Sequence, residues 1–328
     1  MRFGATDCFT AFAMTGKFQM SAAFFRVKFG FKPATRNGVG PSCIAVPSGP
    51  WPSLLDFLTE RFAHVTQATW LERLARGDVL NESGQPITPE QAQHSPSPAH
   101  TRLYYYREVA NESIIPFEAQ MLYQDEHLLV VDKPHFLPVV PSGGYLQQTL
   151  LVRLKRQLGL NDLVPVHRID RDTAGLVLFS KQPASRDAYA ALFRTHQVQK
   201  TYHAIAPWRA DLTLPLTRAS RIKEAGHFML QHEVPGEPNA ITTIDVLEVR
   251  GALARYQLTP VTGQRHQLRV HMLGLGVPIV NDGLYPVLTP ERPTDYSQPL
   301  QLLARDIEFT DPVCGLRHHF VSQRQLMF

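Results

Sequence analysis

The feature that most constrains the fold is a succession of short apolar runs, separated by polar turns, which fills the chain after residue 117. Runs of four or five residues rich in Val, Ile, Leu and Phe are typical of strands. The predicted strands span 128–131, 176–179, 202–206, 246–249 and 254–258. One amphipathic helix is predicted around residues 150–158, with Gly159 at its end. The pattern predicts a strand-rich domain of mixed α and β structure.

Composition excludes several classes of protein. The 328 residues are 44% hydrophobic and 19% charged, so the chain can bury a core and is not disordered by composition. We expect no membrane span and no cleaved leader, because no run of about 18 apolar residues occurs. Cys8, Cys43 and Cys314 lack the spacing of a zinc site or a disulfide framework, which favours a reducing cytoplasm. No Gly-rich phosphate loop is present, so no nucleotide cofactor is predicted.

The charge balance allows a polyanionic partner. The formal net charge is +4, and of 33 basic residues only eight are Lys, which leaves 25 Arg. Arginine binds phosphate through two parallel hydrogen bonds and stacks on bases. The composition therefore slightly favours nucleic acid as the partner, and a monomer is the default expectation.

Two segments lack strong periodicity. Residues 1–50 are predicted to form an irregular N-terminal extension. Residues 88–117 are rich in Pro and polar residues around 103–106, so we expect a linker with one half-buried strand. The expected organisation is an extension at 1–50, a small module with its linker strand at 51–110, and a main domain at 118–328.

The module at 51–110 combines three local patterns. Helices are predicted after the capping residues Ser53 and Thr66, and residues 79–87 predict a hairpin around a Gly turn. Two short helices before a hairpin, with Arg73 and Arg76 on the second helix, resemble the alpha-L RNA-binding module of a small-subunit ribosomal protein and many RNA-modifying enzymes. A small helical cap domain without an RNA-binding role fits the same pattern.

The densest cluster of reactive side chains is His-Arg-Ile-Asp-Arg-Asp-Thr-Ala-Gly at 167–175, directly before a buried apolar run. Asp170 lies between Arg168 and Arg171, and nearby positive charge favours the ionised carboxylate. Such a carboxylate can act as a nucleophile or a base. The alternative is that Asp170 and Asp172 only cap and pair within a turn.

A second cluster, Thr-Gly-Gln-Arg-His-Gln-Leu-Arg-Val-His, occupies 262–271. If a helix begins near His266, Arg265 and Arg269 lie near one face, four residues apart. Their positive charges would suit a phosphate or a carboxylate.

No metal site is predicted from either cluster. An aspartate phosphatase needs the motif Asp-x-Asp-x-Thr, whereas Thr173 follows Asp172 directly. His266 and His271 are five residues apart, which is a poor helical spacing for shared metal ligands, and no Cys or carboxylate joins them.

Together the two clusters resemble the RluA-type family of RNA pseudouridine synthases. The family's loop, His-Arg-Leu-Asp-Arg-x-Thr-Ser-Gly, is matched at 167–175 with Ile169 for Leu and Ala174 for Ser. Further similar blocks occur in the family's order at 132–134, 200–204, 262–271 and 278–285. The resemblance covers about residues 118–328. It implies an α+β fold, a mixed and largely antiparallel sheet with flanking helices and a central catalytic cleft, acting on ribosomal or transfer RNA without cofactor or metal.

The resemblance also implies roles for individual residues. Asp170 would attack the ribose C1′ or remove a proton from C2′, so that the uracil detaches at N1, turns over and is rejoined through C5. Tyr202 would pack against the base and help to move the C5 proton, and Arg269 would pair with Asp170. The expected substrate-binding residues are three arginines that grip phosphates or fill the place of the flipped nucleotide and two apolar pocket walls: Arg168, Arg171, Arg265, Ile169 and Leu268. Surface ion pairs are the alternative for Arg171 and Arg265.

The chain departs from the family pattern at two places. Gln264 stands where the family usually has Arg or Lys, and Arg265 follows it in place of a small residue. His135 and Phe136 replace a small residue and Gly after the Lys-Pro pair, so substrate choice is expected to differ. A protein that kept the fold and binds RNA but lost the reaction is the second hypothesis.

Overall fold

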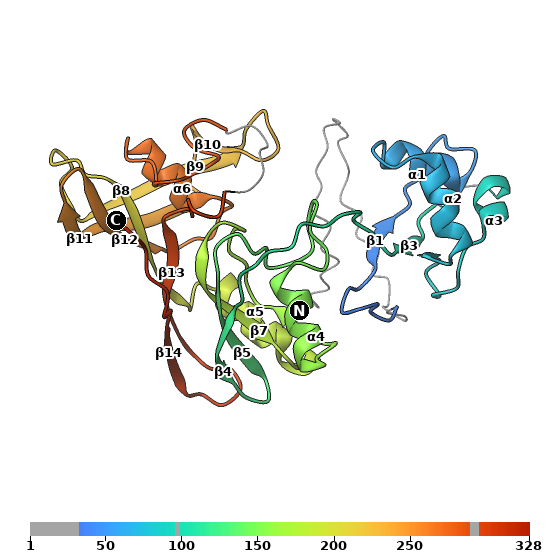
Figure 1. Cartoon of the computed structure of the whole chain (residues 1–328), viewed down its shortest axis with the longest axis horizontal. Helices are drawn as coiled ribbons and strands as arrows, with labels where there is room; N and C mark the ends of the chain where they lie inside the picture. The colour runs from blue at the N-terminus through green and yellow to red at the C-terminus, as the bar shows by residue number, and fades with distance from the viewer. Residues whose placement is uncertain (1–32, 96–98, 289–294) are drawn as a thin grey trace. The chain divides into compact units, whose positions relative to one another are not determined.

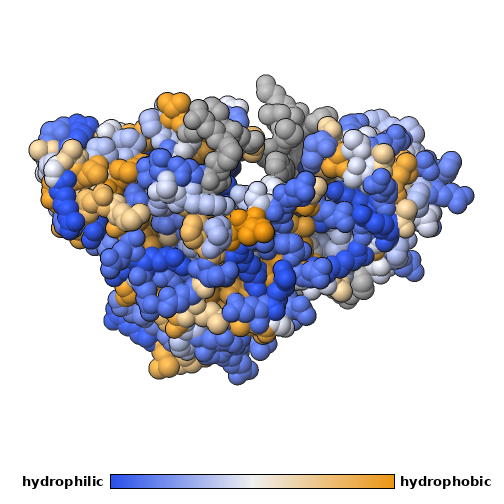
Figure 2. Space-filling model, viewed as in Figure 1, coloured by the Kyte–Doolittle hydropathy of each residue, from blue (hydrophilic) through white to orange (hydrophobic). Residues whose placement is uncertain are grey.

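The structure is a computed structural model that describes residues 33–95, 99–288 and 295–328 (Figure 1). The chain divides into two compact units between Asn111 and Glu112, and each is described by itself. None of the helices in the described ranges has the length and apolar character needed to cross a membrane. Most side chains on the face drawn in Figure 2 are hydrophilic, with apolar residues in small groups.

The first unit is a three-stranded antiparallel sheet with three short helices. The strand order is β1-β3-β2, and the core surrounds the fully buried side chains of Trp70 and Leu58. Its elements are β1 (Ser42–Ala45), α1 (Leu54–Arg61), α2 (Gln67–Ala75), β2 (Val79–Leu80), α3 (Pro89–His94) and β3 (Arg102–Tyr105).

Both predicted helices of this unit are present with the expected caps. Ser53 and Asp56 form a capping box at α1, and the Thr66 side chain accepts a hydrogen bond from the Thr69 backbone at α2. The two predicted arginines, Arg73 within α2 and Arg76 at its C-cap, both make their contacts inside this unit. Arg73 is buried against the Trp70 ring, and Arg76 pairs with Asp78 and Glu108.

Three expectations for this unit were wrong. Residues 42–45 are not irregular but form β1, whose sequence Ser-Cys-Ile-Ala has a single β-branched residue and therefore little strand propensity of its own. The second arm of the hairpin is a single bridge at Pro86, because proline has no N–H for a ladder. The linker contains helix α3, which begins with the capping box of Thr88 and Gln91. The prediction for residues 1–32 lies outside the described residues.

The second unit is built on one large sheet of eleven strands. The strand order is β10-β9-β11-β12-β8-β13-β7-β5-β4, with β14 beside β13 and β6 beside β7. Among the described residues, every pairing is antiparallel except β7 with β13. The predicted α+β class with a mixed, largely antiparallel sheet is confirmed.

The elements of this unit follow the chain in this order: β4 (Gln120–Gln124), β5 (Leu128–Lys133), α4 (Leu150–Leu158), β6 (Val164–Pro165), β7 (Ala174–Ser180), the single 3₁₀ turn Pro183–Ser185, α5 (Arg186–Arg194), β8 (Gln199–Pro207), β9 (Leu216–Glu224), β10 (Gln231–Val234), β11 (Ala240–Arg250), β12 (Leu253–Pro260), α6 (Gln267–Gly274), β13 (Leu302–Thr310) and β14 (Arg317–Val321). The strands β5 and β7 are buried at every residue, so the sequence shows them as continuous apolar runs. Leu150 and Leu154 of α4 pack against one set of their side chains, and Tyr189 and Leu192 of α5 pack against the other set. The loop between β6 and β7 is therefore held by a rigid, fully covered part of the sheet.

Gly175 permits the parallel contact between β7 and β13. Its φ of +111° suits glycine, and a Cβ atom there would overlap the Ala304 backbone. We expect Gly175→Ala to lower the free energy of unfolding by about 2 to 3 kcal/mol, from backbone strain and overpacking. Urea unfolding followed by near-UV circular dichroism measures this. Gly144→Ala is the matched control, because nothing lies within 4 Å of its Cβ position; equal stability of the two variants would contradict the assignment.

Candidate active site

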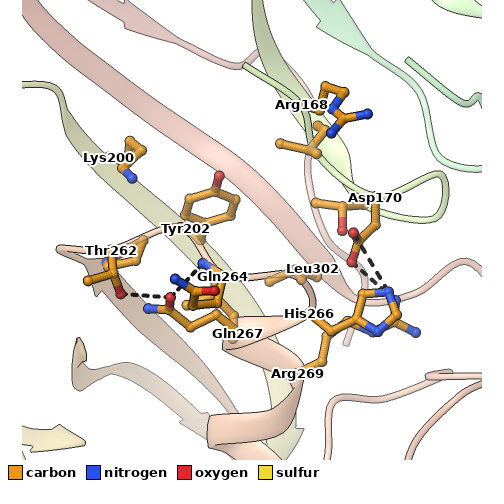
Figure 3. Close-up of a pocket in the computed structure, with 15 residues that line it drawn as sticks. Arg168, Asp170, Lys200, Tyr202, Thr262, Gln264, His266, Gln267, Arg269 and Leu302 are labelled. Atoms are coloured by element: carbon orange, nitrogen blue, oxygen red, sulfur yellow. Dashed lines mark hydrogen bonds and ion pairs between the residues drawn. The ribbon is translucent and has the colours of Figure 1, made fainter. Parts of the chain in front are cut away.

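A cavity opens in the second unit between the loop before β7, the strand β8 and the start of α6 (Figure 3). Its lining residues are Arg168, Ile169, Asp170, Thr173, Lys200, Tyr202, Pro260, Thr262, Gly263, Gln264, His266, Gln267, Leu268, Arg269 and Leu302. Six of the eight residues predicted from the sequence are among them. Arg171 and Arg265 are not.

Asp170 and Arg269 meet at the cavity although they are 99 residues apart in the sequence. Arg269 Nη1 donates to Asp170 Oδ2 over 3.2 Å, and the Asp170 side chain remains 29% exposed. Figure 3 shows the two groups facing each other from the loop and from α6. The carboxylate is therefore held by a guanidinium and still accessible to a substrate.

A second carboxylate fixes the direction of Arg269. The Arg269 guanidinium donates from Nε to Asp282 Oδ2 over 2.8 Å and from Nη2 to Asp282 Oδ1 over 2.5 Å. The Asp282 side chain is wholly buried and also accepts hydrogen bonds from the backbone of Leu284 and Tyr285. Burial alone would lower the pKa of Arg269, but Asp282 and Asp170 raise it above the ordinary value, so Arg269 stays charged. Sequence reasoning gave Asp282 no role.

The Asp170 carboxyl is ionised at neutral pH. Burial would raise its pKa, but the attraction of His266, which is protonated at the low pH where Asp170 titrates, the charge of Arg269 and the Arg269 hydrogen bond outweigh burial and place the pKa below its ordinary value. Burial also lowers the pKa of His266, whose Nε2 lies 3.9 Å from Asp170 Oδ1. Because His266 is then uncharged at neutral pH, Arg269 supplies the positive charge there. His266 was missed as a site residue, since its five-residue distance from His271 pointed only to a weak metal motif.

Tyr202 approaches Asp170 from the middle of the sheet. Its strand β8 lies between β12 and β13, where Tyr202 pairs with Leu258 and Ala304. Figure 3 shows the phenol ring between Lys200 and Asp170. Burial raises the pKa of Tyr202 and the charge of Asp170 raises it further, so the hydroxyl stays protonated at neutral pH.

Gln267 fixes the segment that contains Gln264 and Arg265, where the chain first departs from the family pattern. Its side-chain oxygen accepts from Thr262 Oγ1 over 2.7 Å and from the Gln264 backbone over 3.0 Å. Arg265 donates to the Phe228 carbonyl over 2.8 Å. The uncharged side chain of Gln264 thus lines the cavity, whereas the charged side chain of Arg265 is bonded to Phe228 outside it. Gln267 and Lys200 were not singled out from the sequence, because a buried amide and one lysine in a strand give no local signal.

His135, at the second departure from the family pattern, anchors the loop that carries Asp170. His135 Nδ1 donates to the Asp172 carbonyl over 2.7 Å, and burial lowers the pKa of His135 to about 4. Phe136 stacks on Phe117 with ring centroids 5.9 Å apart. Arg171 Nε donates to Asp172 Oδ1 over 2.8 Å. The ion-pair alternative for Arg171 therefore matches its contacts, and no side chain of this group lines the cavity.

Lys133 fixes the same loop from the end of β5. It is wholly buried, and its Nζ donates to the carbonyls of Arg171 and Pro134, each over 2.9 Å. Burial lowers its pKa to about 7, against the attraction of Asp172 and Asp170. The Lys133 amine thus links the loop to the end of β5 through these two hydrogen bonds.

The lowered pKa of Lys133 predicts a pH dependence of stability. Between pH 7 and 10 the unfolded chain binds a proton at Lys133 that the folded chain does not, so the free energy of unfolding rises with pH. We expect the free energy of unfolding to rise by about 1 kcal/mol per pH unit more in the wild type than in Lys133→Met. Urea unfolding at pH 7, 8 and 9 measures this difference. Lys223→Met, at an exposed lysine, should follow the wild type. Parallel curves for the wild type and Lys133→Met would refute the assignment.

Comparison with known proteins identifies the family. Residues 127–273 match the family model described as RNA pseudouridylate synthase. An RNA pseudouridine synthase of Synechocystis sp. is 30% identical over 71% of this chain and 79% of its own length. The dual-specificity RNA pseudouridine synthase RluA of Haemophilus influenzae is 32% identical over 60% of this chain and 88% of its own length. The ribosomal large subunit pseudouridine synthase C of Vibrio cholerae is 31% identical over 65% of this chain and 64% of its own length.

A solved structure agrees with this fold. The human RNA Pseudouridylate Synthase Domain Containing 1 superimposes with a TM-score of 0.52 at 20% identity, covering 67% of this chain and 86% of that chain. The resemblance read from the two sequence clusters is confirmed by these matches. The chain therefore belongs to the RluA-type family of RNA pseudouridine synthases.

Proposed function

We propose that this RNA pseudouridine synthase isomerises one uridine of ribosomal or transfer RNA, with Asp170 as the catalytic carboxylate. The observation that carries the proposal is the 3.2 Å hydrogen bond from Arg269 to an Asp170 side chain that is ionised and 29% exposed in a cavity. The relatives support the RNA class, since one is named for the large ribosomal subunit and another, a mitochondrial enzyme of Saccharomyces cerevisiae, is named for tRNA.

In one route of the proposed reaction, an oxygen of Asp170 attacks C1′ while the N1–C1′ electron pair leaves with the uracil. The detached uracil turns, and C5 forms the new bond to C1′ as the aspartate leaves. In the alternative route, Asp170 removes the C2′ proton, the C2′–H electron pair forms a C1′=C2′ double bond as the uracil leaves, and the proton returns to C2′ when C5 bonds to C1′. C5 then loses its proton and N1 gains one, so the product is an isomer of the substrate. Tyr202, protonated beside Asp170, can pack against the base and take part in the C5 proton transfer.

The nucleotide must leave its helix to reach Asp170, at a cost of a few kcal/mol. Arg168 at the cavity is the proposed residue for gripping phosphate or filling the vacated place. Ile169 and Leu268 are the proposed apolar walls, since both line the cavity and pack in the hydrophobic core. Arg171 and Arg265 are proposed for contacts with RNA outside the cavity, in addition to their bonds within the protein.

We also propose that the first unit contacts the RNA, because its two capped helices, α1 and α2, follow each other as in the alpha-L module that the sequence resembles. Arg73 and Arg76 are engaged inside the unit, so other exposed groups such as Arg61 would carry the contact. Ultraviolet cross-linking of the full chain to its substrate RNA should yield RNA-linked peptides from α1 or α2. Cross-links confined to the second unit would contradict this role.

The proposed enzyme works as a monomer in the cytoplasm, and its reaction step needs no metal ion or cofactor because a carboxylate carries out the displacement. Pseudouridines mapped in ribosomal and transfer RNA from cells with and without this gene should differ at one site or a few sites. The same sites should return when the gene is restored. Identical maps would refute the proposal.

A further inference from the structure

A cluster of potential metal ligands lies at the turn between β13 and β14, outside the active site. Asp311, Cys314 and His318 each offer one ligand atom, and these atoms lie within 4.8 Å of one another. Leu302, at the other end of β13, lines the cavity. Thr310 is eight positions further along the strand than Leu302, which corresponds to roughly 25 Å.

Asp311 is fixed in place before any ligand arrives. It is only 2% exposed, and its Oδ2 accepts a hydrogen bond of 2.7 Å from the Tyr189 hydroxyl of α5. Its Oδ1 accepts from the backbone of Val313 and Cys314, over 2.8 and 3.0 Å. Hydrogen bonds of this kind orient a carboxylate ligand and hold a metal site in its geometry.

His318 supplies an observation of its own. Its Nε2 is buried and has no hydrogen-bond partner, and its 3.7 Å distance to Asp311 Oδ2 is too long for a hydrogen bond. The ring is held by stacking on Phe320, with centroids 5.3 Å apart, and by contact with Tyr123. Buried ring nitrogens without a partner are rare in native proteins, and a metal ion at this position is one partner that satisfies the nitrogen.

The chemistry of the three groups selects the metal. Cys314 is a free, exposed thiol that lies against the Asp311 carboxylate, so an ion can reach the cluster from solvent. Sulfur and imidazole ligands exclude a preference for Mg²⁺ or Ca²⁺, whereas S, N and O together are the usual ligands of Zn²⁺.

We propose that Asp311, Cys314 and His318 bind one Zn²⁺ ion, with a fourth position open to water. The ion takes the place of the thiol proton and joins the β13–β14 turn to α5 through the Asp311–Tyr189 hydrogen bond. The spacing of the cysteines in the sequence did not indicate this site, because the site contains only one cysteine together with a carboxylate and a histidine. The site is independent of the reaction at Asp170.

The test uses the full chain, reduced and freed of metal by a chelator that is then removed. Titration with Co²⁺ should give the thiolate-to-cobalt charge-transfer band at one equivalent, and Zn²⁺ should displace it and raise the melting temperature. Cys314→Ser should abolish the band, and His318→Gln should weaken binding more than about tenfold. Cys43→Ser and His319→Gln are matched controls, one at the other cysteine of the described residues and one at a histidine bonded to Asp306. Both should bind like the wild type.

Three outcomes would overturn the proposal. The first is no charge-transfer band in the wild-type protein, which leaves only a hydrogen-bonded thiol and carboxylate. The second is equal binding by all four variants, which indicates adventitious ions on the surface. The third is loss of the band in the Cys43→Ser control. The cobalt titration of the wild type decides the first outcome even if a variant fails to fold.

Discussion

Replacing Asp170 by Asn is expected to abolish pseudouridine formation while leaving the fold intact. The amide keeps the size of the side chain but cannot act as an anionic nucleophile or base, so kcat should fall at least about 10⁴-fold. Arg269 keeps both of its hydrogen bonds to Asp282, so the buried cation remains paired. Single-turnover assays on substrate RNA, with pseudouridine quantified by mass spectrometry, measure the effect.

Asp172→Asn is the matched control for this prediction. Asp172 is two residues away, and its side chain pairs with Arg171 and does not line the cavity. It should retain kcat within about tenfold and bind RNA as the wild type does. Undiminished activity of Asp170→Asn, or an equal loss in both variants, would show that Asp170 is not the catalytic carboxylate.

Replacing Arg269 by Met is expected to damage stability as well as activity. Arg269 is 2% exposed and bonds two carboxylates, one of which, Asp282, is wholly buried. Removing one partner of a buried ion pair leaves the other charge without compensation, which costs about 3 to 5 kcal/mol. We expect the melting temperature of the second unit to fall by roughly 10 °C in a calorimetric scan.

Arg265→Met separates this effect from a general loss of arginine. Arg265 lies four residues away and makes one hydrogen bond to the Phe228 carbonyl at an exposed position. Its stability should change by less than about 1 kcal/mol. Changing Asp282 to Asn together with Arg269→Met should recover part of the lost stability without restoring activity, because Asp170 stays unpaired. A wild-type melting temperature for Arg269→Met would contradict the buried-pair interpretation.

The two variants distinguish two roles within one pair. Asp170 acts on the substrate in the proposed reaction, whereas Arg269 acts through Asp170 and also through Asp282. Loss of activity with a normal fold is expected only for the first.

The zinc proposal is tested apart from these predictions. Chelation should leave the reaction step unchanged, since the Asp311 cluster lies at the far end of β13. Asp170→Asn should bind Co²⁺ like the wild type. A failure of the metal site and a failure of the catalytic assignment would therefore be seen in different experiments.

Several elements of the fold were readable because their signals are local. The helices α1 and α2 have caps within three residues of their starts, and β5 and β7 are short apolar runs covered on both faces. The strand β1 and the helix α3 were missed, since β1 has a single β-branched residue and the six residues of α3 are too few to display a helical period. Pairing with β3 provides the stability that β1 lacks by itself.

The sequence by itself determined which residues we propose for the chemistry, because Asp170, Tyr202 and Arg269 stand in blocks whose order resembles that of one enzyme family. Only the tertiary structure decided what holds them. In the folded chain Asp282 bonds to Arg269, His266 lies near Asp170, and Lys133 bonds to the backbone of the loop before β7. The physical reason is that burial and the distances between charges depend on the whole packed sheet, and residues far apart in the chain meet only when that sheet has formed.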